Sequence, residues 1–355
     1  MLDCGGDVRG LFRQVVDIES VSGREGPLAD AVMAALAGRD HLSVERHGNV
    51  IVARTAWGRP QRVIVAGHLD TVPVKDNLPS RLTTVDGRAA LVGRGTCDMK
   101  GGLAAGLALA WGVTDAAVDL TWVFYDNEEV EAAKNGLGLL AAARPDLLRA
   151  DMAILMEPTD GALEAGCQGT LRADLTTTGV AAHTARSWLG HNAIHEMAGV
   201  LAALEEYEAP TVMVEGLAYR EGLNAVWITG GVAGNVVPDR CTVSVNYRFA
   251  PDKTVTEAEA TVRDLLAGHE LTVTDAAPAA RPNLGGALMR SFVDAVGAPI
   301  RPKLGWTDVA RFAGLGIPAI NYGPGDPNLC HTDGEWAFLD AVQTCHDTLR
   351  EWLTA

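Results

Sequence analysis

The chain alternates between short, continuously apolar runs and longer segments with helical spacing. Apolar runs without polar alternation, which are typical of strands buried on both faces, occur at 62–66, 119–125, 151–156 and 317–322. Helical patterns around them predict helices at 7–19, 27–38 and 99–111. Buried strands that are separated by helices predict an α/β sheet covered on both sides.

A different pattern occupies the middle of the chain, where polar and apolar positions alternate as in half-exposed strands. Such strands are predicted at 169–179, 225–229, 241–249 and 269–273, with helices at 192–206 and 256–266. This order predicts a small α+β domain with an exposed sheet, and the proline-containing segment 278–283 fits a return linker. We therefore expect residues 169–279 to be inserted into a discontinuous domain of residues 1–168 and 280–355.

Length and composition agree with two globular domains. The 355 residues exceed the usual size of a single hydrophobic core, and 48% of them are hydrophobic. The net charge of −16 argues against nucleic acid as a partner. We expect no membrane segment, because no apolar run is long enough, and the N-terminus has no secretory pattern. Six scattered cysteines without a CxxC pair predict reduced thiols in the cytoplasm.

Side chains that bind metals follow several of the apolar runs. His68 follows the first run, the doublet Glu128–Glu129 follows the second, and Glu157 directly follows the third. In an α/β sheet, ligands bind beyond the carboxyl ends of the strands, so we expect these side chains at one edge. Asp70 lies two residues past His68, on the same side of an extended segment, and can accept the second ring N–H of His68.

Two further candidate ligands lie in glycine-rich segments. Asp98 is surrounded by four glycines within 93–102, and its carboxylate is suited to bridging two cations. The alternative interpretation of Asp98 is an N-cap on the helix predicted at 99–111. His331 lies in a loop rich in glycine and proline, where a histidine is more often functional than on an apolar face.

Together the candidate ligands are two histidines and three carboxylates: His68, Asp98, Glu129, Glu157 and His331. This set is too large for one tetrahedral zinc and is the right number for two metals that share a carboxylate. Glu128 is then a spare carboxylate that can take a proton from water. The competing interpretation of the acidic doublet is the first turn of a helix, where carboxylates are favoured by the macrodipole.

Seven motifs occur in the chain in a characteristic order: GHLDTVP, GRGTCDMKGGLAA, the EE doublet, EP at 157–158, AAHTARSWLGHNAIH, GNVVPD and HTDGE. With them the chain resembles the M20 family of metallo-aminoacylases and peptidases over nearly its whole length. Within the family it is most similar to the succinyl-diaminopimelate desuccinylases, particularly the actinobacterial form. The resemblance implies a zinc-peptidase-like α/β catalytic domain with a mixed sheet and an inserted α+β lid domain that dimerises.

The resemblance also implies how two divalent cations are held, with zinc as the expected metal and cobalt as the alternative. Asp98 would bridge the two cations. His68 and Glu157 would complete one site. Glu129 and His331 would complete the other.

Further roles follow from the same resemblance. Glu128 would be the general base and acid, and Asp70 would orient His68. His183, in the inserted domain, would reach the active site of the other subunit of a homodimer and polarise the scissile carbonyl. Without the resemblance, His183 would be interpreted as an ordinary loop histidine.

The inserted domain would also bind the substrate through Asn235 and Arg248. A planar guanidinium suits a carboxylate, although an arginine in an alternating strand usually faces solvent. The chain departs from the family pattern at Cys167–Gln168, where other desuccinylases carry paired arginines, and Thr170 is kept beside them. Thr307 stands next to the place of another expected threonine.

The implied reaction is hydrolysis of N-succinyl-LL-2,6-diaminopimelate to succinate and LL-2,6-diaminopimelate, in lysine and meso-diaminopimelate biosynthesis. The substrate would be a small anionic N-acyl amino acid. Arg172 or Arg186 is a candidate to replace the missing arginines, and this departure leaves the acyl group open. The alternatives are another M20 deacylase or peptidase, such as an acetylornithine deacetylase, aminoacylase or dipeptidase, and a catalytically silent metal-binding paralogue.

Overall fold

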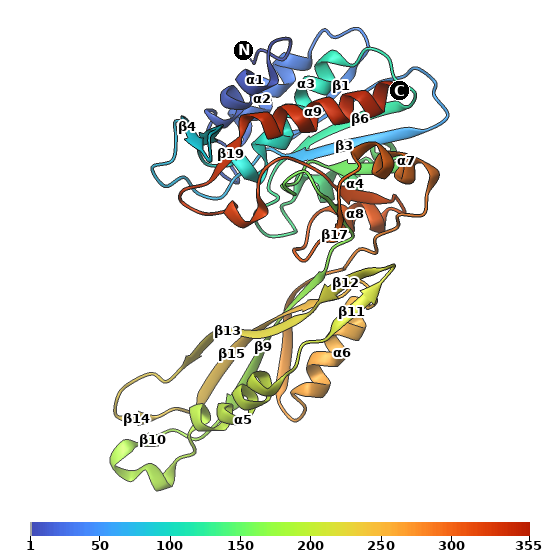
Figure 1. Ribbon diagram of the computed structural model, residues 1–355. Helices are drawn as coiled ribbons and strands as arrows, with labels where there is room; N and C mark the ends of the chain where they lie inside the picture. The colour runs from blue at the N-terminus through green and yellow to red at the C-terminus, as the bar shows by residue number, and fades with distance from the viewer. Residues whose placement is uncertain (1) are drawn as a thin grey trace. The chain divides into compact units, whose positions relative to one another are not determined.

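The computed structural model describes residues 2–355, which fold into two units (Figure 1). The first unit extends to Ala165 and includes Asn283–Arg301 and Arg311–Ala355, whereas the second consists of Gly166–Pro282 and Pro302–Ala310. The predicted insertion, 169–279, lies entirely within the second unit. The segment Pro302–Ala310, which was expected in the first domain, groups with the second unit.

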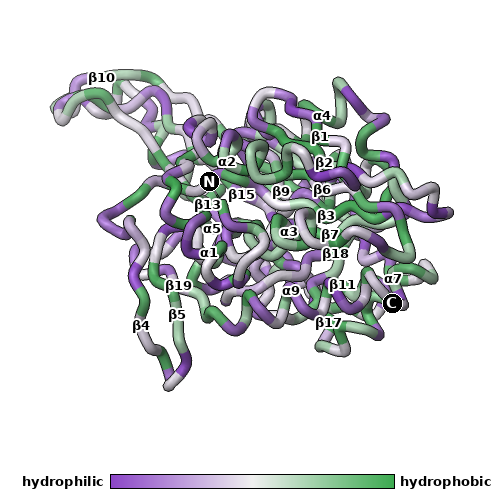
Figure 2. The backbone as a smooth tube through the Cα atoms, turned by 90° about the horizontal axis from the view of Figure 1, so that it is seen from above, coloured by the Kyte–Doolittle hydropathy of each residue, from purple (hydrophilic) through white to green (hydrophobic). Residues whose placement is uncertain are grey.

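A mixed eight-stranded sheet forms the centre of the first unit. In spatial order its strands are β1 (Ser43–His47), β2 (Val50–Arg54), β6 (Asp119–Tyr125), β3 (Arg62–His68), β7 (Met152–Leu155), β18 (Ala319–Asn321), β8 (Leu163–Ala165) and β17 (Ile300–Pro302). The middle strands β6, β3, β7 and β18 run parallel, and antiparallel partners flank them. All residues of β6 and β7 are buried, as their apolar sequences predict, and hydrophobic colour is prominent around β3 and β7 in Figure 2.

Helices cover both sides of this sheet. They are α1 (Val8–Val16), α2 (Gly26–Leu36), α3 (Gly101–Gly112), α4 (Gly136–Ala143), α7 (Ala287–Val296), α8 (Val309–Gly314) and α9 (Leu339–Thr354), with short helical turns at Thr96–Lys100, Pro145–Leu148 and Pro327–Leu329. Figure 1 shows α1, α3 and α9 side by side on one side of the sheet, with α4 on the other. A small antiparallel sheet of β4 (Arg81–Val85), β5 (Arg88–Val92) and β19 (Trp336–Phe338) completes the unit.

The start of α3 differs from its prediction. The helix begins at Gly101 with Lys100 as its N-cap, and Asp98 lies in the preceding turn with φ −112° and ψ 97°, outside helical geometry. The interpretation of Asp98 as an N-cap is therefore wrong, and its carboxylate is not used to cap the helix.

Small residues bring α3 close to the sheet. A side chain on Gly102 would overlap the main-chain oxygen of Met156, the residue before Glu157. A side chain on Gly106, one turn further along α3, would make only ordinary contacts with Phe124 and Val65. Because Gly102 has no side chain, the first turn of α3 can lie this close to the end of β7.

The second unit is the expected α+β domain. Its antiparallel sheet has the order β13 (Gly222–Gly230), β15 (Arg240–Phe249), β9 (Gly169–Thr178) and β16 (Glu270–Ala277). A hairpin pairs β11 (Thr211–Val214) with β12 (Leu217–Arg220), and the short strands β10 (Ala182–His183) and β14 (Val236–Val237), which are distant in the sequence, pair antiparallel. The buried residues of β9 and β15 alternate along each strand, as predicted, and pack with α5 (Ala193–Glu206) and α6 (Val255–Leu265). A turn at Thr184–Leu189 follows β10.

The predicted helices and strands correspond to observed elements within a few residues, except that β13 begins at Gly222 and β16 continues to Ala277. The sequence patterns did not indicate α9 or the small β4–β5–β19 sheet. Within residues 2–355, no helix combines the length and the hydrophobicity that a membrane span requires.

We predict that Gly102→Ala lowers the free energy of unfolding by about 1–3 kcal/mol, because the new methyl group must displace the end of β7. Gly106→Ala is the matched control in the same helix and should be neutral or stabilising by up to about 1 kcal/mol, through helix propensity. Urea denaturation of both variants measures the difference. Equal effects of the two substitutions would contradict the close approach at Gly102.

Candidate metal centre

The candidate ligands from β3 and β7 lie at the same edge of the sheet. His68 is the last residue of β3, and Glu157 comes two residues after the end of β7. Ala66 pairs with Leu155 in the parallel ladder, and His68 and Glu157 each lie two residues beyond that pair. The register of two buried strands therefore places this imidazole and this buried carboxyl group on neighbouring strand ends.

Asp98 lies between two imidazoles. Its Oδ1 is 3.0 Å from Nε2 of His68, and its Oδ2 is 3.4 Å from Nε2 of His331. The three residues are separated by 30 and 233 positions in the chain, so the fold and not local sequence brings them together. Each oxygen faces a different ring, which is the arrangement that a bridging carboxylate requires.

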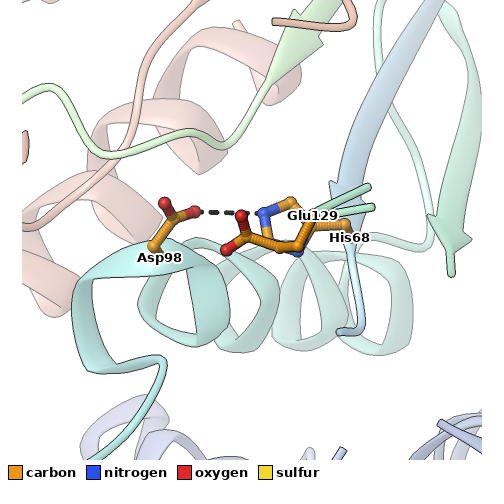
Figure 3. Close-up of side chains that lie close together, drawn as sticks. All are labelled: His68, Asp98 and Glu129. Carbon is orange, nitrogen blue, oxygen red and sulfur yellow. Dashed lines mark hydrogen bonds and ion pairs between the residues drawn. The ribbon is translucent and has the colours of Figure 1, made fainter. Parts of the chain in front are cut away.

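Glu129 completes this group from the turn after β6. Its Oε1 lies 3.0 Å from Nε2 of His331. Figure 3 shows the side chains of His68, Asp98 and Glu129 gathered at one place, and the donor atoms of these three lie within 4.8 Å of one another. His331 has a positive φ of 64°, a conformation that is uncommon outside glycine and directs its ring from the loop toward the two carboxylates.

Asp70 supports the centre in a way that differs from the prediction. The Nδ1 of His68 is closer to the main-chain oxygen of Asp70, at 2.9 Å, than to its carboxylate, at 3.5 Å. The carboxylate instead accepts the N–H groups of Glu128, at 3.0 Å, and Glu129, at 3.1 Å, and the hydroxyl of Ser22, at 2.8 Å. Asp70 is fully buried and thereby fixes both His68 and the acidic turn.

The acidic doublet does not begin a helix. Residues 128–130 form a bend, and α4 begins at Gly136 with Asn135 as its N-cap. The interpretation of the doublet as an acidic helix turn is therefore wrong. Glu128 is half-buried in this bend, directly beside Glu129, and the N–H groups of both bind Asp70.

The electrostatics of the centre favour bound positive charge. Hydrogen bonds with Asp98 and Glu129 raise the pKa of His331 to about 10. Burial acts to lower the pKa of His68, but hydrogen bonds with Asp70 and Asp98 raise it well above its ordinary value. Burial opposes ionisation of Asp98, yet the two imidazoles hold its pKa below the usual range. The carboxylates thus favour cations beside them, either protons on the rings or metal ions.

The donor set fits two divalent cations. Imidazole nitrogen and carboxylate oxygen are ordinary zinc ligands, and the central carboxylate has one oxygen toward each imidazole. Residues that would hold cations are the five predicted ones, four of which are connected by the distances above and the fifth, Glu157, by the sheet register. Metal binding would require the two imidazoles to lose their protons.

In the second unit, the structure brings the catalytic candidate His183 and three of the substrate-binding candidates together in two pairs. His183 pairs with Val236 in the β10–β14 ladder, and the main-chain oxygen of Asn235 accepts the N–H of Thr184 at 3.0 Å. Arg248 is the ladder partner of Thr170. His183 is exposed, and its Nδ1 accepts the N–H of the residue two positions later.

Arg248 is half-buried and does not simply face solvent. Its Nε donates to Oδ1 of Asn246 at 3.2 Å, and Nδ2 of Asn246 donates to the hydroxyl of Thr170 at 3.3 Å. Burial and the neighbouring Arg172 lower the pKa of Arg248. Thr307 is buried in the segment 302–310, where its main-chain oxygen lies 3.8 Å from Sγ of Cys167.

The two residues that stand where other desuccinylases carry paired arginines are shielded from solvent. Cys167 and Gln168 are buried, and Nε2 of Gln168 donates to the main-chain oxygen of Arg220 at 2.6 Å. Of the two candidate replacements, Arg172 is paired with Asp275 at 2.8 Å. Arg186 is exposed in the turn after β10.

Sequence reasoning missed several residues that support the centre. Ser22 binds Asp70, and the sulfur of Met99 lies 3.2 Å from the main-chain nitrogen of His68. Arg94 lies within the motif GRGTCDMKGGLAA and Glu335 within HTDGE, but the sequence did not indicate a role for either residue. The sequence signal that could have identified Glu335 is an acidic residue four positions after His331 within the same motif, and the structure shows it to be buried.

A family model described as peptidase family M20/M25/M40 matches residues 64–355. A Mycobacterium tuberculosis protein that carries the provisional name succinyl-diaminopimelate desuccinylase is 50% identical to this chain, with 99% of each chain covered. The succinyl-diaminopimelate desuccinylase of Corynebacterium glutamicum is 44% identical over 99% of this chain and 98% of its own. The chain belongs to peptidase family M20/M25/M40.

The fold agrees with this family. A metallo-carboxypeptidase of the M20 family from Sulfolobus solfataricus superposes with a TM-score of 0.76, at 16% identity and with 98% of each chain covered. At this identity the likeness concerns the fold, including its mixed sheet and the additional α+β unit. The M20 resemblance expected from the seven motifs is confirmed by the family match.

We predict that metal-free protein loses stability through His331 as the pH rises from about 6.5 to about 10. Its pKa is raised from 6.5 to about 10 in the folded state, so its contribution is complete below the lower value and is lost at the higher one. Urea midpoints of metal-free wild type and His331→Gln should differ most near pH 6 and converge near pH 10. A constant difference across this range would show that the imidazolium does not contribute.

Proposed function

We propose that this protein is a dinuclear metal amidohydrolase that converts N-succinyl-LL-2,6-diaminopimelate and water into succinate and LL-2,6-diaminopimelate. The observation that carries the proposal is the carboxylate of Asp98 between two imidazoles, 3.0 Å from His68 and 3.4 Å from His331. The substrate is inferred from the two actinobacterial relatives, which are 50% and 44% identical over almost the full chain. Zinc is the proposed metal, and cobalt is the alternative.

Two divalent cations, when bound, supply positive charge that lowers the pKa of a water molecule toward neutrality and polarises the amide carbonyl. The protein's residues position the groups and move the proton. Glu128 takes the proton of the attacking water and delivers it to the leaving amine. Asp70 holds the N–H groups of Glu128 and Glu129, so that the base and a ligand keep a fixed separation.

In the second unit, Arg248 is the proposed partner for a substrate carboxylate. Its guanidinium is partly desolvated, and Asn246 orients it through Nε, which leaves the terminal nitrogens for a bidentate contact. Asn235, Thr170 and Thr307 are proposed to contribute polar contacts around the substrate. Cys167–Gln168 offer no cation to the acyl group, and Nε2 of Gln168 donates to a main-chain oxygen.

We further propose that the protein is a homodimer joined through β13. This strand is an edge of its sheet, and it exposes Val226, Trp227 and Ile228 by 56%, 69% and 50%. An exposed apolar edge strand offers main-chain groups and apolar area to a second copy. His183 is proposed to act on the carbonyl in the active site of the other subunit.

We also propose a cytoplasmic location, in which the thiols stay reduced. All six cysteines are free thiols, and five of them are buried.

We predict that N-succinyl-LL-2,6-diaminopimelate is hydrolysed with a kcat/KM about 100-fold or more above that of N-acetylornithine and of dipeptides, because binding groups for the second carboxylate reject substrates without it. Turnover of the three substrates is measured on one zinc-loaded sample whose metal content is determined. Preference for acetylornithine or a dipeptide would favour those alternatives, and no turnover by protein with two metals would favour a silent paralogue.

The same assay tests whether Glu128 is the general base. Glu128→Gln should lower kcat by about 10²–10⁴-fold, because the amide cannot accept the proton of water. Metal content should not change. Glu131→Gln is the matched variant, since Glu131 lies in the same acidic segment but is exposed and paired with Lys134 at 2.9 Å, and it should retain full turnover.

We predict that mixing two inactive variants restores activity if His183 acts across the dimer. Glu128→Gln supplies an intact His183, and His183→Ala supplies an intact Glu128. Random exchange gives half heterodimers with one complete site each, or about a quarter of wild-type activity. Activity is measured after subunit exchange by mild denaturation and refolding, with exchange checked by differently tagged chains. Mixed dimers without activity would place His183 beside the Glu128 of its own chain or outside catalysis.

A further inference from the structure

A buried carboxylate behind the metal centre binds the loop that carries Asp98. Oε1 of Glu335 accepts the N–H of Cys97 at 2.8 Å and of Asp98 at 3.1 Å. Its Oε2 accepts the N–H of Gly95 at 2.9 Å. Glu335 is 1% exposed, so water does not compete for these three donors.

The fourth donor to this carboxylate is a buried arginine that connects three segments of the centre. Nη1 of Arg94 is 3.0 Å from Oε2 of Glu335 and 3.0 Å from the main-chain oxygen of Thr332, the residue after His331. Nε of Arg94 donates to the main-chain oxygen of Pro73, in the segment that follows His68 and Asp70. The ion pair between Arg94 and Glu335 thus contacts both the segment that follows His68 and the loop that carries His331.

The loop held by Glu335 has internal hydrogen bonds at its two ends, from Thr96 to the main-chain oxygen of Gly93 and from the N–H of Lys100 to the main-chain oxygen of Gly95. Gly95 has a positive φ of 79°, and Asp98 lies outside helical geometry, so helix hydrogen bonds do not set the position of Asp98. Three converging N–H groups around one carboxylate fix this stretch of backbone instead. A bridging ligand must keep both oxygens within a few tenths of an ångström of their productive positions.

We infer that Glu335 is a positioning residue of the metal centre, which holds Asp98 as a bridging ligand through the backbone of residues 95–98 and, together with Arg94, sets the loop of His331. This inference rests on the proposed two-metal function. A positioning role of Glu335 differs from a purely structural role. Loss of its carboxylate should change the binding of metal more than it changes the folding of the chain.

The chain contains a matched control for a buried carboxylate that binds backbone. Asp119 accepts the N–H groups of Trp57 at 2.8 Å and Arg59 at 3.0 Å and lies 3.5 Å from Arg62. It is 5% exposed, but it is the first residue of β6, at the opposite end of the strand from Glu128 and Glu129. Asp119→Asn therefore removes a similar set of contacts far from the ligands.

The test is metal binding by Glu335→Gln, whose amide places an NH2 group against N–H donors. We expect zinc affinity, measured by competition with a chromophoric chelator, to fall by about 10–100-fold. Asp119→Asn should keep affinity within about twofold of wild type, even if its melting temperature falls as much. The visible absorption of bound Co²⁺ at saturation should change in Glu335→Gln, since it reports coordination geometry, and not in Asp119→Asn.

Unchanged affinity and an unchanged Co²⁺ spectrum in folded Glu335→Gln would overturn the inference, and so would equal losses in Asp119→Asn. If Glu335→Gln does not fold, Glu335→Asp decides the question: it keeps the charge but retracts the carboxylate, so wild-type affinity in this variant would also overturn the inference. Wild-type protein that binds fewer than two metals would instead contradict the proposed function, which separates the two failures.

Discussion

The centre depends on one arrangement, a carboxylate with each of its oxygens toward a different imidazole. Asp98 occupies that position between His68 and His331, and Glu129 adds a second negative charge at 3.0 Å from the latter ring. Unneutralised charges at such distances in a partly buried site are costly. The group is stable only with positive charge among its members, and the raised pKa values of both histidines express that requirement.

Rigid main chain makes this arrangement possible. Strand register fixes His68 and Glu157, whereas Asp98, Glu129 and His331 come from short turns and bends. Buried groups behind them compensate, since Asp70 binds the N–H groups of the acidic turn and Glu335 binds those of the Asp98 loop. Both acceptor residues, Asp70 and Glu335, are buried, so water does not compete for their carboxylate oxygens.

Sequence patterns predicted the elements that a local run of residues determines. They missed the features that depend on contacts with residues far away in the chain. Apolar runs located β3, β6 and β7, and with them the strand-end positions of His68 and Glu157. The Glu128–Glu129 doublet has an equally good local interpretation as a helix start, and the buried carboxylate of Asp70, 58 residues earlier, decides for a bend. Ser22 has no apolar pattern around it, so its bond to Asp70 could not be foreseen.

The negative net charge of −16 is compatible with an anionic substrate only if local cations dominate the binding site. Arg172 is neutralised by Asp275, and Gln168 is an uncharged amide, so neither offers free positive charge. Arg248 does, because its guanidinium hydrogen-bonds to the uncharged Asn246. The candidate metal ligands belong to the first unit and the candidate substrate-binding residues to the second. Residues such as Cys167 and Gln168 can therefore differ between relatives while the candidate ligand set of the first unit stays the same.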